Sequence, residues 1–181
     1  MDHSELRGRL LVAAPSLTDP NFRLAVVLLL DHTDEGAVGV LLNRPSDMPL
    51  ASALPQWEPL ATSPDAVFLG GPVQRDAIVA LGRTPIASDS PLQRILAGTA
   101  VVDLQIDPDQ QPADLQSVRL FAGYAGWGAG QLEAEIDAGG WFVVEAEAAD
   151  VFTDEPAQLW DRVLARQGGI FRTLPPDPTL N

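Results

Sequence analysis

The sequence predicts a single α+β domain that spans residues 1–181. Strand-like apolar runs follow one another without regularly intervening helices, which argues against a doubly wound sheet. Clear helical periodicity is confined to the last third of the chain. No internal repeat, low-complexity linker or shift in composition divides the 181 residues, a length that can bury a full core. Residues 1–7 and 173–181 are expected to be flexible ends.

Three apolar runs in the first quarter of the chain are predicted to be strands. Residues 8–14 read GRLLVAA and stop at Pro15, and residues 24–30, LAVVLLL, form the longest apolar run. Residues 38–43, VGVLLN, follow the short polar segment DHTDEGA. Two apolar runs around such a segment indicate a β-hairpin.

The middle of the chain is punctuated by proline, with five between residues 45 and 64 around a short helix predicted near 49–54. Strands predicted at 66–69 and 78–81 flank GGPVQRD and are expected to pair with each other. The remaining strands of this region are predicted at 100–106 and 118–122, separated by the turn-rich DPDQQPAD.

Helices are predicted late in the sequence. In residues 129–138 two apolar side chains lie four apart, and Gly139-Gly140 marks the end. A strand, WFVVEA, is predicted at 141–146. The segment TDEPAQLWDRVLARQGG has a capping Thr or Asp, a proline in the first turn and an apolar stripe at helical spacing. The tail LPPDPTLN is expected to be disordered.

Charge and composition restrict the classes of function. The 25 acidic residues outnumber 11 arginines, no lysine occurs, and the net charge is −14. A field this negative repels nucleic acid and anionic membranes, so neither is expected as a partner. Without cysteine, disulfides and thiolate sites are excluded. No apolar run approaches the roughly 18 residues that span a bilayer. A cytoplasmic protein is expected.

Familiar catalytic and cofactor motifs are missing. The phosphate-binding P-loop requires a lysine, and the dinucleotide fingerprint fails because Gln131 stands where its third glycine belongs. No Gly-x-Ser-x-Gly, His-Glu-x-x-His or cysteine zinc pattern occurs. His32 could serve a Ser-His-Asp site, but a solvated hairpin histidine is the preferred interpretation. The sequence predicts no catalytic residues, cofactor or metal site.

Four segments at predicted strand ends are rich in Gly, Pro, Asn or Arg: PSLTDPNF, NRP, GGPV and GYAGWGAGQL. Arg44 is the obvious anion-seeking group, since a guanidinium grips a carboxylate or phosphate with two parallel hydrogen bonds. An internal ion pair of Arg44 with an acid such as Asp19 or Glu133 is, however, the preferred interpretation. The predicted ligand-binding residues are Asn43, Arg44, Gly70, Gly71, Tyr124 and Trp127.

The glycine-rich run GYAGWGAG is interpreted mainly as structural. Gly123 and Gly126 are expected to turn the chain sharply off its strand, with Tyr124 and Trp127 lying across the mouth of the fold. Gly128 and Gly130 would then bring the following helix close. A ligand pocket is the alternative interpretation.

These blocks resemble the AlgH/YqgE family of bacterial proteins. The resemblance rests on GRLLVAAPSLTDPNFRLAVVLLLDHTDEGAVGVLLNRP, FLGGPV and FAGYAGWGAGQLEAEI with the following Trp141, and it covers the chain from Gly8 to about Gly169. It implies a bifurcated, mostly antiparallel sheet that curls into a pseudo-barrel with helices packed around it. It also implies a role in transcriptional regulation, with no catalytic residues or cofactor to carry over.

Three classes of function remain open on the sequence. The preferred one is a regulatory or adaptor domain that binds an unknown protein partner or a small anionic ligand. The first alternative is an enzyme whose site is built from Asp19, His32, Asn43 or Arg44. The second alternative, a direct DNA-binding regulator, is disfavoured by the charge. The oligomeric state is open.

Overall fold

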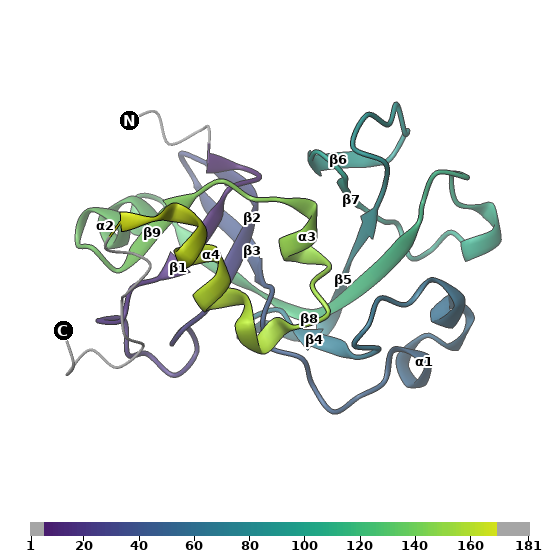
Figure 1. The fold of residues 1–181 in the computed structure, drawn as a ribbon, viewed down its shortest axis with the longest axis horizontal. Coiled ribbons are helices and arrows are strands. Elements are labelled where there is room, and N and C mark those ends of the chain that lie inside the picture. Colours follow the sequence, from purple (N-terminus) through teal and green to yellow (C-terminus); the bar gives the residue numbers. More distant parts are fainter. Residues whose placement is uncertain (1–5, 170–181) are drawn as a thin grey trace.

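The computed structural model describes residues 6–169 (Figure 1). Most of the two predicted flexible ends lies outside these residues. Of the N-terminal stretch, Leu6 is buried, and the guanidinium of Arg7 donates to the carbonyl oxygens of Leu30 and Arg94. The chain is therefore anchored from residue 6 onward.

One curled, mostly antiparallel sheet of nine strands forms the framework of the fold. Its order is β6-β7-β5-β8-β3-β2-β1-β9, with β4 beside β8 in parallel. The strands are β1 (Leu10–Ala13), β2 (Val26–Thr33), β3 (Gly36–Leu41), β4 (Val67–Leu69), β5 (Val73–Arg83), β6 (Gln93–Leu96), β7 (Thr99–Val101), β8 (Ser117–Gly128) and β9 (Trp141–Val144). The helices are α1 (Leu50–Ala53), α2 (Gln131–Asp137), α3 (Ala148–Val151) and α4 (Leu159–Gln167), with 3-10 turns η2 (Pro55–Leu60), η3 (Pro108–Gln110) and η4 (Pro156–Gln158).

Strand β8 divides the sheet into two branches. Its first part pairs with β5 on one side and β4 on the other, and its last residues, Ala125–Gly128, pair with β3. Gly70 lies at the fork, where its N–H donates to the Ala122 carbonyl and its own carbonyl accepts from the Leu41 N–H. Figure 1 shows β8 running from the branch with β5, β6 and β7 to the branch with β1, β2 and β9.

The apolar core has three parts, and each lies between the sheet and a different set of helices. Helices α3 and α4 cover one face of the sheet, and the indole N–H of Trp160 anchors α4 to the Ala13 carbonyl. A second cluster lies beneath α2 and contains Trp127 and Trp141. The third lies beneath α1 and η2 around Trp57.

Most predicted elements are present, and the fold class is confirmed. The hairpin of β2 and β3 forms as expected, around a turn at residues 34–35. The predicted pairing of the strands that flank GGPVQRD is wrong, because β4 and β5 lie on opposite sides of β8. Strand β6 and helix α3 were not predicted, and the strand predicted at 100–106 ends at Val101.

The glycine-rich run is a strand rather than a loop. β8 continues through GYAGWG to Gly128, and of its glycines only Gly123 has a positive φ, at 75°. The expected sharp turn off the strand occurs at neither Gly123 nor Gly126, because both lie within β8. Gly130, with φ of 73°, then begins helix α2, as the sequence suggested.

Candidate anion-binding site

Asn43 follows β3 and is occupied by backbone contacts. Its side-chain amide donates to the Leu24 carbonyl at 2.9 Å, and its side-chain oxygen accepts from the Val26 N–H at 3.1 Å. Leu24 has a positive φ of 57°, which is uncommon for a residue with a side chain. Asn43 thus holds the chain in this conformation where it enters β2, and its amide is not directed at a ligand.

Arg44 is half-buried and directs its guanidinium at the segment before β2. One terminal nitrogen donates to the Asn21 carbonyl and the other to the Arg23 carbonyl at 2.9 Å. Burial lowers the pKa of Arg44 from its ordinary value, and the charge of Asp19 opposes this shift. Within residues 6–169 the ion pairs involve His32 and Arg166, so neither Asp19 nor Glu133 forms one with Arg44.

Gly70 and Gly71 are required for a close approach of two backbones. A Cβ on Gly70 would lie 2.3 Å from the Gly123 oxygen, and one on Gly71 would lie 2.2 Å from the Tyr124 carbonyl. Real Cβ contacts are essentially never this short. These two glycines therefore let the segment between β4 and β5 lie directly on β8, as expected for glycine at such a crossing.

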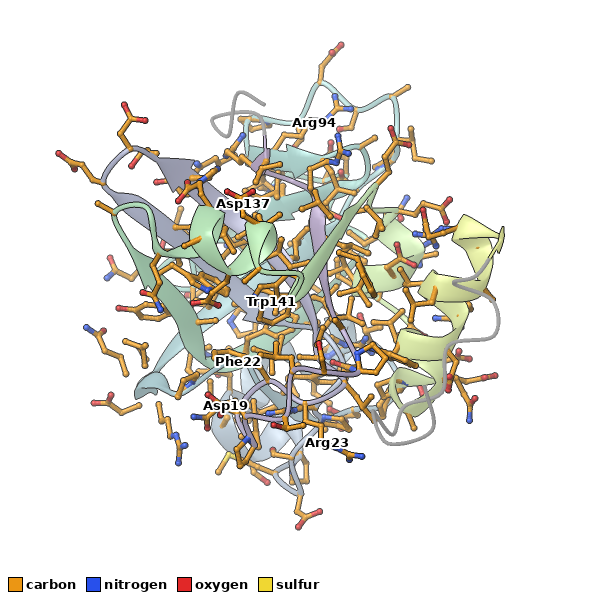
Figure 2. All side chains as sticks on the ribbon, turned by 90° about the vertical axis from the view of Figure 1, so that its left-hand side faces the viewer. Asp19, Phe22, Arg23, Arg94, Asp137 and Trp141 are labelled. Atoms are coloured by element: carbon orange, nitrogen blue, oxygen red, sulfur yellow. The ribbon has the colours of Figure 1, made fainter. Side chains whose placement is uncertain are left out.

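Tyr124 and Trp127 lie on opposite faces of β8, because they are an odd number of residues apart in a strand. Tyr124 packs on the cluster beneath α3 and α4, whereas Trp127 belongs to the cluster beneath α2. Trp127 stacks on Phe22 and meets Trp141 edge-on. Figure 2 shows Phe22 beside Trp141. Glu135 accepts hydrogen bonds from both indoles, so these two tryptophans are part of the core.

Arg44 and Gly71 share a small pocket of about 150 Å³. A second arginine, Arg75, also belongs to the lining. The lining residues are Asn21, Leu41, Arg44, Leu69, Gly71, Pro72, Arg75 and Ala122. The structure thus brings Arg44 and Gly71 together, and it places Trp127 at a different pocket beside α2.

Arg75 is the pocket residue that sequence reasoning missed. The pairing of β5 with β8 shifts register between Val73 and Ile78, and Gln74 in this bulge has a positive φ of 46°. Arg75 is exposed and makes no hydrogen bond or ion pair with another described residue. A bulge re-aims side chains in a way that alternation does not predict. The one signal in the sequence for this bulge is the segment GGPVQRD, whose two glycines and proline are typical of irregular backbone.

The pocket is suited to binding rather than to chemistry. Two guanidiniums can hold the oxygens of a carboxylate or phosphate. The lining also includes the apolar side chains of Leu41, Leu69 and Ala122. No lining residue is an acid, a histidine or a hydroxyl nucleophile.

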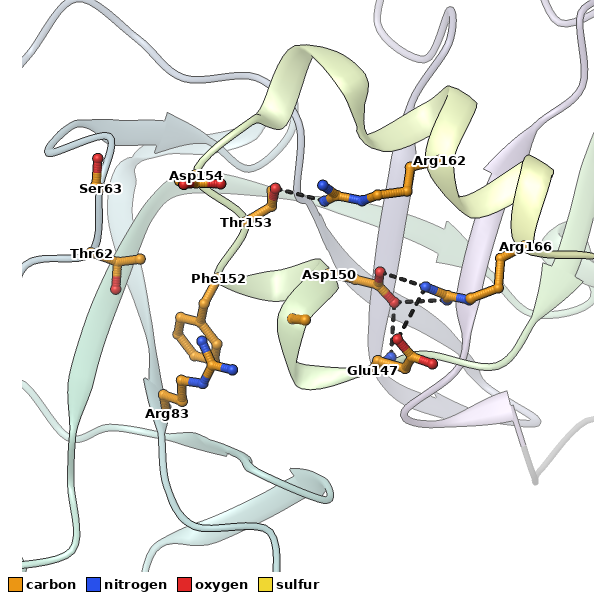
Figure 3. A pocket seen from close by; sticks show the side chains of 11 residues that line it. Thr62, Ser63, Arg83, Glu147, Asp150, Phe152, Thr153, Asp154, Arg162 and Arg166 are labelled. Carbon is orange, nitrogen blue, oxygen red and sulfur yellow. Dashed lines mark hydrogen bonds and ion pairs between the residues drawn. The ribbon is translucent and has the colours of Figure 1, made fainter.

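A larger cleft, of about 660 Å³, lies between helices α3 and α4 on one side and the end of β5 on the other (Figure 3). Three arginines and three acids line it, and several of these charges compensate one another. Arg166 pairs with both carboxylate oxygens of Asp150 at 2.9 Å and with Glu147 at 3.3 Å, and hydrogen bonding by Asp150 raises the pKa of Arg166. Arg162 donates to the Thr153 hydroxyl.

Arg83 and Phe152 form another wall of this larger cleft, with the guanidinium carbon 5.8 Å from the ring centroid. Behind the cleft lies Arg119, which is 1% exposed. Arg119 donates to the carbonyl oxygens of Val151, Thr153 and Ser63. Burial lowers the pKa of Arg119 to about 10, and Asp154 opposes the shift. The hydrogen bonds of Arg119 thus attach α3 and the residues that follow it to the sheet, and these residues form much of the cleft wall.

His32 is not the solvated hairpin residue that the sequence suggested. It is 5% exposed, and its Nε2 lies 2.5 Å from a carboxylate oxygen of Glu133. The reason is that α2 packs against β3 and β8, which brings Glu133 to His32 on the neighbouring strand β2. His32 therefore joins α2 to the sheet and does not line the Arg44–Arg75 pocket.

Within residues 6–169, no group of three or more His, Asp or Glu side chains could hold a metal ion. None of the helices in that range has both the length and the apolar character needed to cross a membrane.

The geometry defines a single-domain α+β protein with a forked sheet and a small pocket lined by two arginines. Comparison with known proteins gives its family. The model of the AlgH-like family matches residues 10–172, and the chain belongs to that family.

Relatives and solved structures of this family resemble the chain over most of its length. A UPF0301 protein of Streptomyces coelicolor is 46% identical over 98% of this chain and 96% of its own. One of Thermobifida fusca is 47% identical over 100% and 98%. The crystal structure of DIP2367 from Corynebacterium diphtheriae has a TM-score of 0.86 at 34% identity, covering 91% of this chain and 88% of that one. The solution structure of AlgH from Pseudomonas aeruginosa has a TM-score of 0.69 at 33% identity, covering 91% and 89%.

Proposed function

We propose that the protein is a regulatory or adaptor domain that binds an anionic group through Arg44 and Arg75. One observation carries the proposal: two arginines line one small pocket, and neither is ion-paired to a carboxylate within residues 6–169. In a chain with a net charge of −14, carboxylates are plentiful. Asp19 acts on Arg44 through its charge but forms no ion pair with it, so both arginines are suited to a carboxylate or phosphate from outside.

The two arginines have different roles in this site. Arg44 is held by two backbone carbonyls, so its remaining N–H groups point in a fixed direction, and preorganisation of this kind lowers the entropic cost of binding. Arg75 is exposed and supplies the second guanidinium from the bulge of β5. The absence of an acid, base or nucleophile from the lining favours binding over catalysis.

The test is a titration with two simple anions, inorganic phosphate and glutarate, followed by amide chemical shifts. We expect saturable shifts at Gly71, Arg75 and Ala122. Arg75→Gln should weaken binding at least about tenfold, equivalent to roughly 1.4 kcal/mol, without loss of stability. The matched control is Arg83→Gln, which removes a guanidinium from the larger cleft and should leave the affinity unchanged.

Arg44→Lys is a second variant with a distinct expectation. Lysine keeps the charge but loses the planar fork, so both anion binding and the hold on the segment before β2 should weaken. Binding that survives Arg75→Gln and is abolished by Arg83→Gln would move the site to the larger cleft. The absence of saturable binding in the wild-type protein would refute the proposal.

A further inference from the structure

We propose that the anionic group is an acidic side chain of a partner protein, presented on an extended segment with an apolar residue beside it. This inference rests on the proposed function of the Arg44–Arg75 pocket. It adds a second surface, an exposed row of apolar side chains next to the pocket, and the two together define the class of partner.

The apolar row crosses three neighbouring strands. Leu69 on β4 and Ile78 on β5 are both in register with Ala122 on β8, one from each side. Leu69 is 48% exposed and Ile78 is 38% exposed. Adjacent strands are about 4.8 Å apart, so the row extends roughly 10 Å across the sheet.

The row is the uncovered end of a face that is buried elsewhere. Residues two apart in a strand share a face, so Leu69, Ala122 and Ile78 lie on the same face as Val67, Leu120 and Ala80. Those three are buried in the cluster beneath α1 and η2. Helix α1 and η2 thus cover the buried part of this face but leave Leu69 and Ile78 exposed.

The row and the pocket form one surface. Leu69 and Ala122 belong to both, since they also line the pocket with Arg44 and Arg75. The pocket alone, at about 150 Å³, is smaller than the roughly 300–1,000 Å³ of sites for drug-sized ligands. It has room for one carboxylate-bearing side chain, and the apolar row has room for that side chain's neighbour.

Charge complementarity identifies the partner as acidic. The chain carries a net charge of −14, which would oppose an acidic segment over most of the surface. At this surface the two arginines reverse that preference locally. In an extended peptide, residues two apart point to the same side, so the expected segment has an acidic residue two positions from an apolar one.

The experiment measures binding of fluorescein-labelled peptides by anisotropy. The probe alternates serine with Glu and Leu in the order Ser-Glu-Ser-Leu, repeated twice, and two control peptides replace Glu by Gln or Leu by Ser. We expect the probe to bind at least about tenfold more tightly than either control, because each removes one of the two contacts.

Variants of the protein separate the apolar row from the pocket. Ile78→Ser should weaken binding of the probe about tenfold and leave phosphate binding at Arg75 intact, because Ile78 does not line the pocket. Ile86→Ser is the matched control, because Ile86 is 70% exposed elsewhere and its loss should have no effect. Unfolding curves of each variant identify any loss of the fold.

Two results would overturn the inference in different ways. If phosphate binds at Arg75 but Ile78→Ser binds the probe like the wild type, the pocket takes small anions only and the partner proposal is wrong. If neither phosphate nor the probe binds, the proposed function fails with it.

Discussion

Gly123 shows how one residue determines the shape of the pocket. It has a φ of 75°, and a Cβ there would lie 2.5 Å from the Gly71 oxygen and 2.9 Å from the Val73 oxygen. The same Cβ would be 3.3 Å from the Cα of Arg75. Gly126 differs in both respects, since its φ is not positive and the nearest atom to an added Cβ is 3.7 Å away.

The first prediction compares these two glycines. Gly123→Ala should lower the free energy of unfolding by roughly 1–3 kcal/mol through backbone strain, with a further loss from the contacts. Gly126→Ala should change it little and serves as the control. Urea unfolding of both variants measures the difference. Equal stabilities would show that the backbone at Gly123 can relax.

A second prediction concerns Asn43. Asn43→Ala leaves the Leu24 carbonyl and the Val26 N–H without their partner, and each lost bond of this kind costs about 1–3 kcal/mol when the group stays buried. We expect a lower melting temperature and weaker anion binding, because the segment that positions Arg44 loosens. Asn43→Asp keeps the acceptor and should be less destabilised. A melting temperature unchanged by Asn43→Ala would contradict this role.

At the scale of elements, the attachment of α3 to the sheet depends on Arg119. Its guanidinium supplies hydrogen bonds to three carbonyls from two segments, and it lies 4.4 Å above the Phe68 ring. Helix α3 has only four residues and would not be stable alone. The hydrogen bonds of the buried Arg119 therefore fix α3 on the sheet, whereas a longer helix would be held by its apolar packing.

The third prediction follows from this arrangement. Arg119→Met fills similar space but leaves the three carbonyl oxygens without donors, so we expect a loss of about 3 kcal/mol or more in the free energy of unfolding. Limited proteolysis should then cut first near residues 151–155. Arg94→Met, which removes an exposed arginine side chain from β6, is the control. Stability equal to that of the wild type would show that the carbonyls find other donors.

The elements differ in how far the sequence determines them. The apolar runs of β1, β2 and β3 are visible because buried strands of a sheet need continuous apolar residues. The sequence predicts β8 only as far as Ala122, because the glycines that follow have a low propensity for strands. Its glycines are tolerated since β4, β5 and β3 surround it and supply the hydrogen bonds.

The candidate site was only partly visible for a similar reason. Arg44 and Gly71 were found because an arginine and a glycine at strand ends are local signals. Tyr124 and Trp127 could be grouped only on the assumption of a loop, and the strand separates them onto two faces. The position of Arg75 depends on a register shift between β5 and β8, which no local pattern encodes.

For the whole molecule, the charge gives the fourth prediction. With 25 acidic residues against 11 arginines, we expect no measurable affinity for duplex DNA at physiological salt, measured by fluorescence anisotropy. Several arginines are also engaged internally, as Arg44, Arg119 and Arg166 are. Submicromolar binding with a steep salt dependence would contradict the expectation and favour a direct DNA-binding regulator.

The fork at β8 has a consequence for amide hydrogen exchange. The first part of β8 is bonded to β4 and β5, and its last four residues are bonded to β3, so one continuous strand belongs to both branches. Neither branch can open fully without breaking bonds to β8. The slowest-exchanging amides should therefore lie in β8 and report a single opening free energy at both of its ends, that of global unfolding.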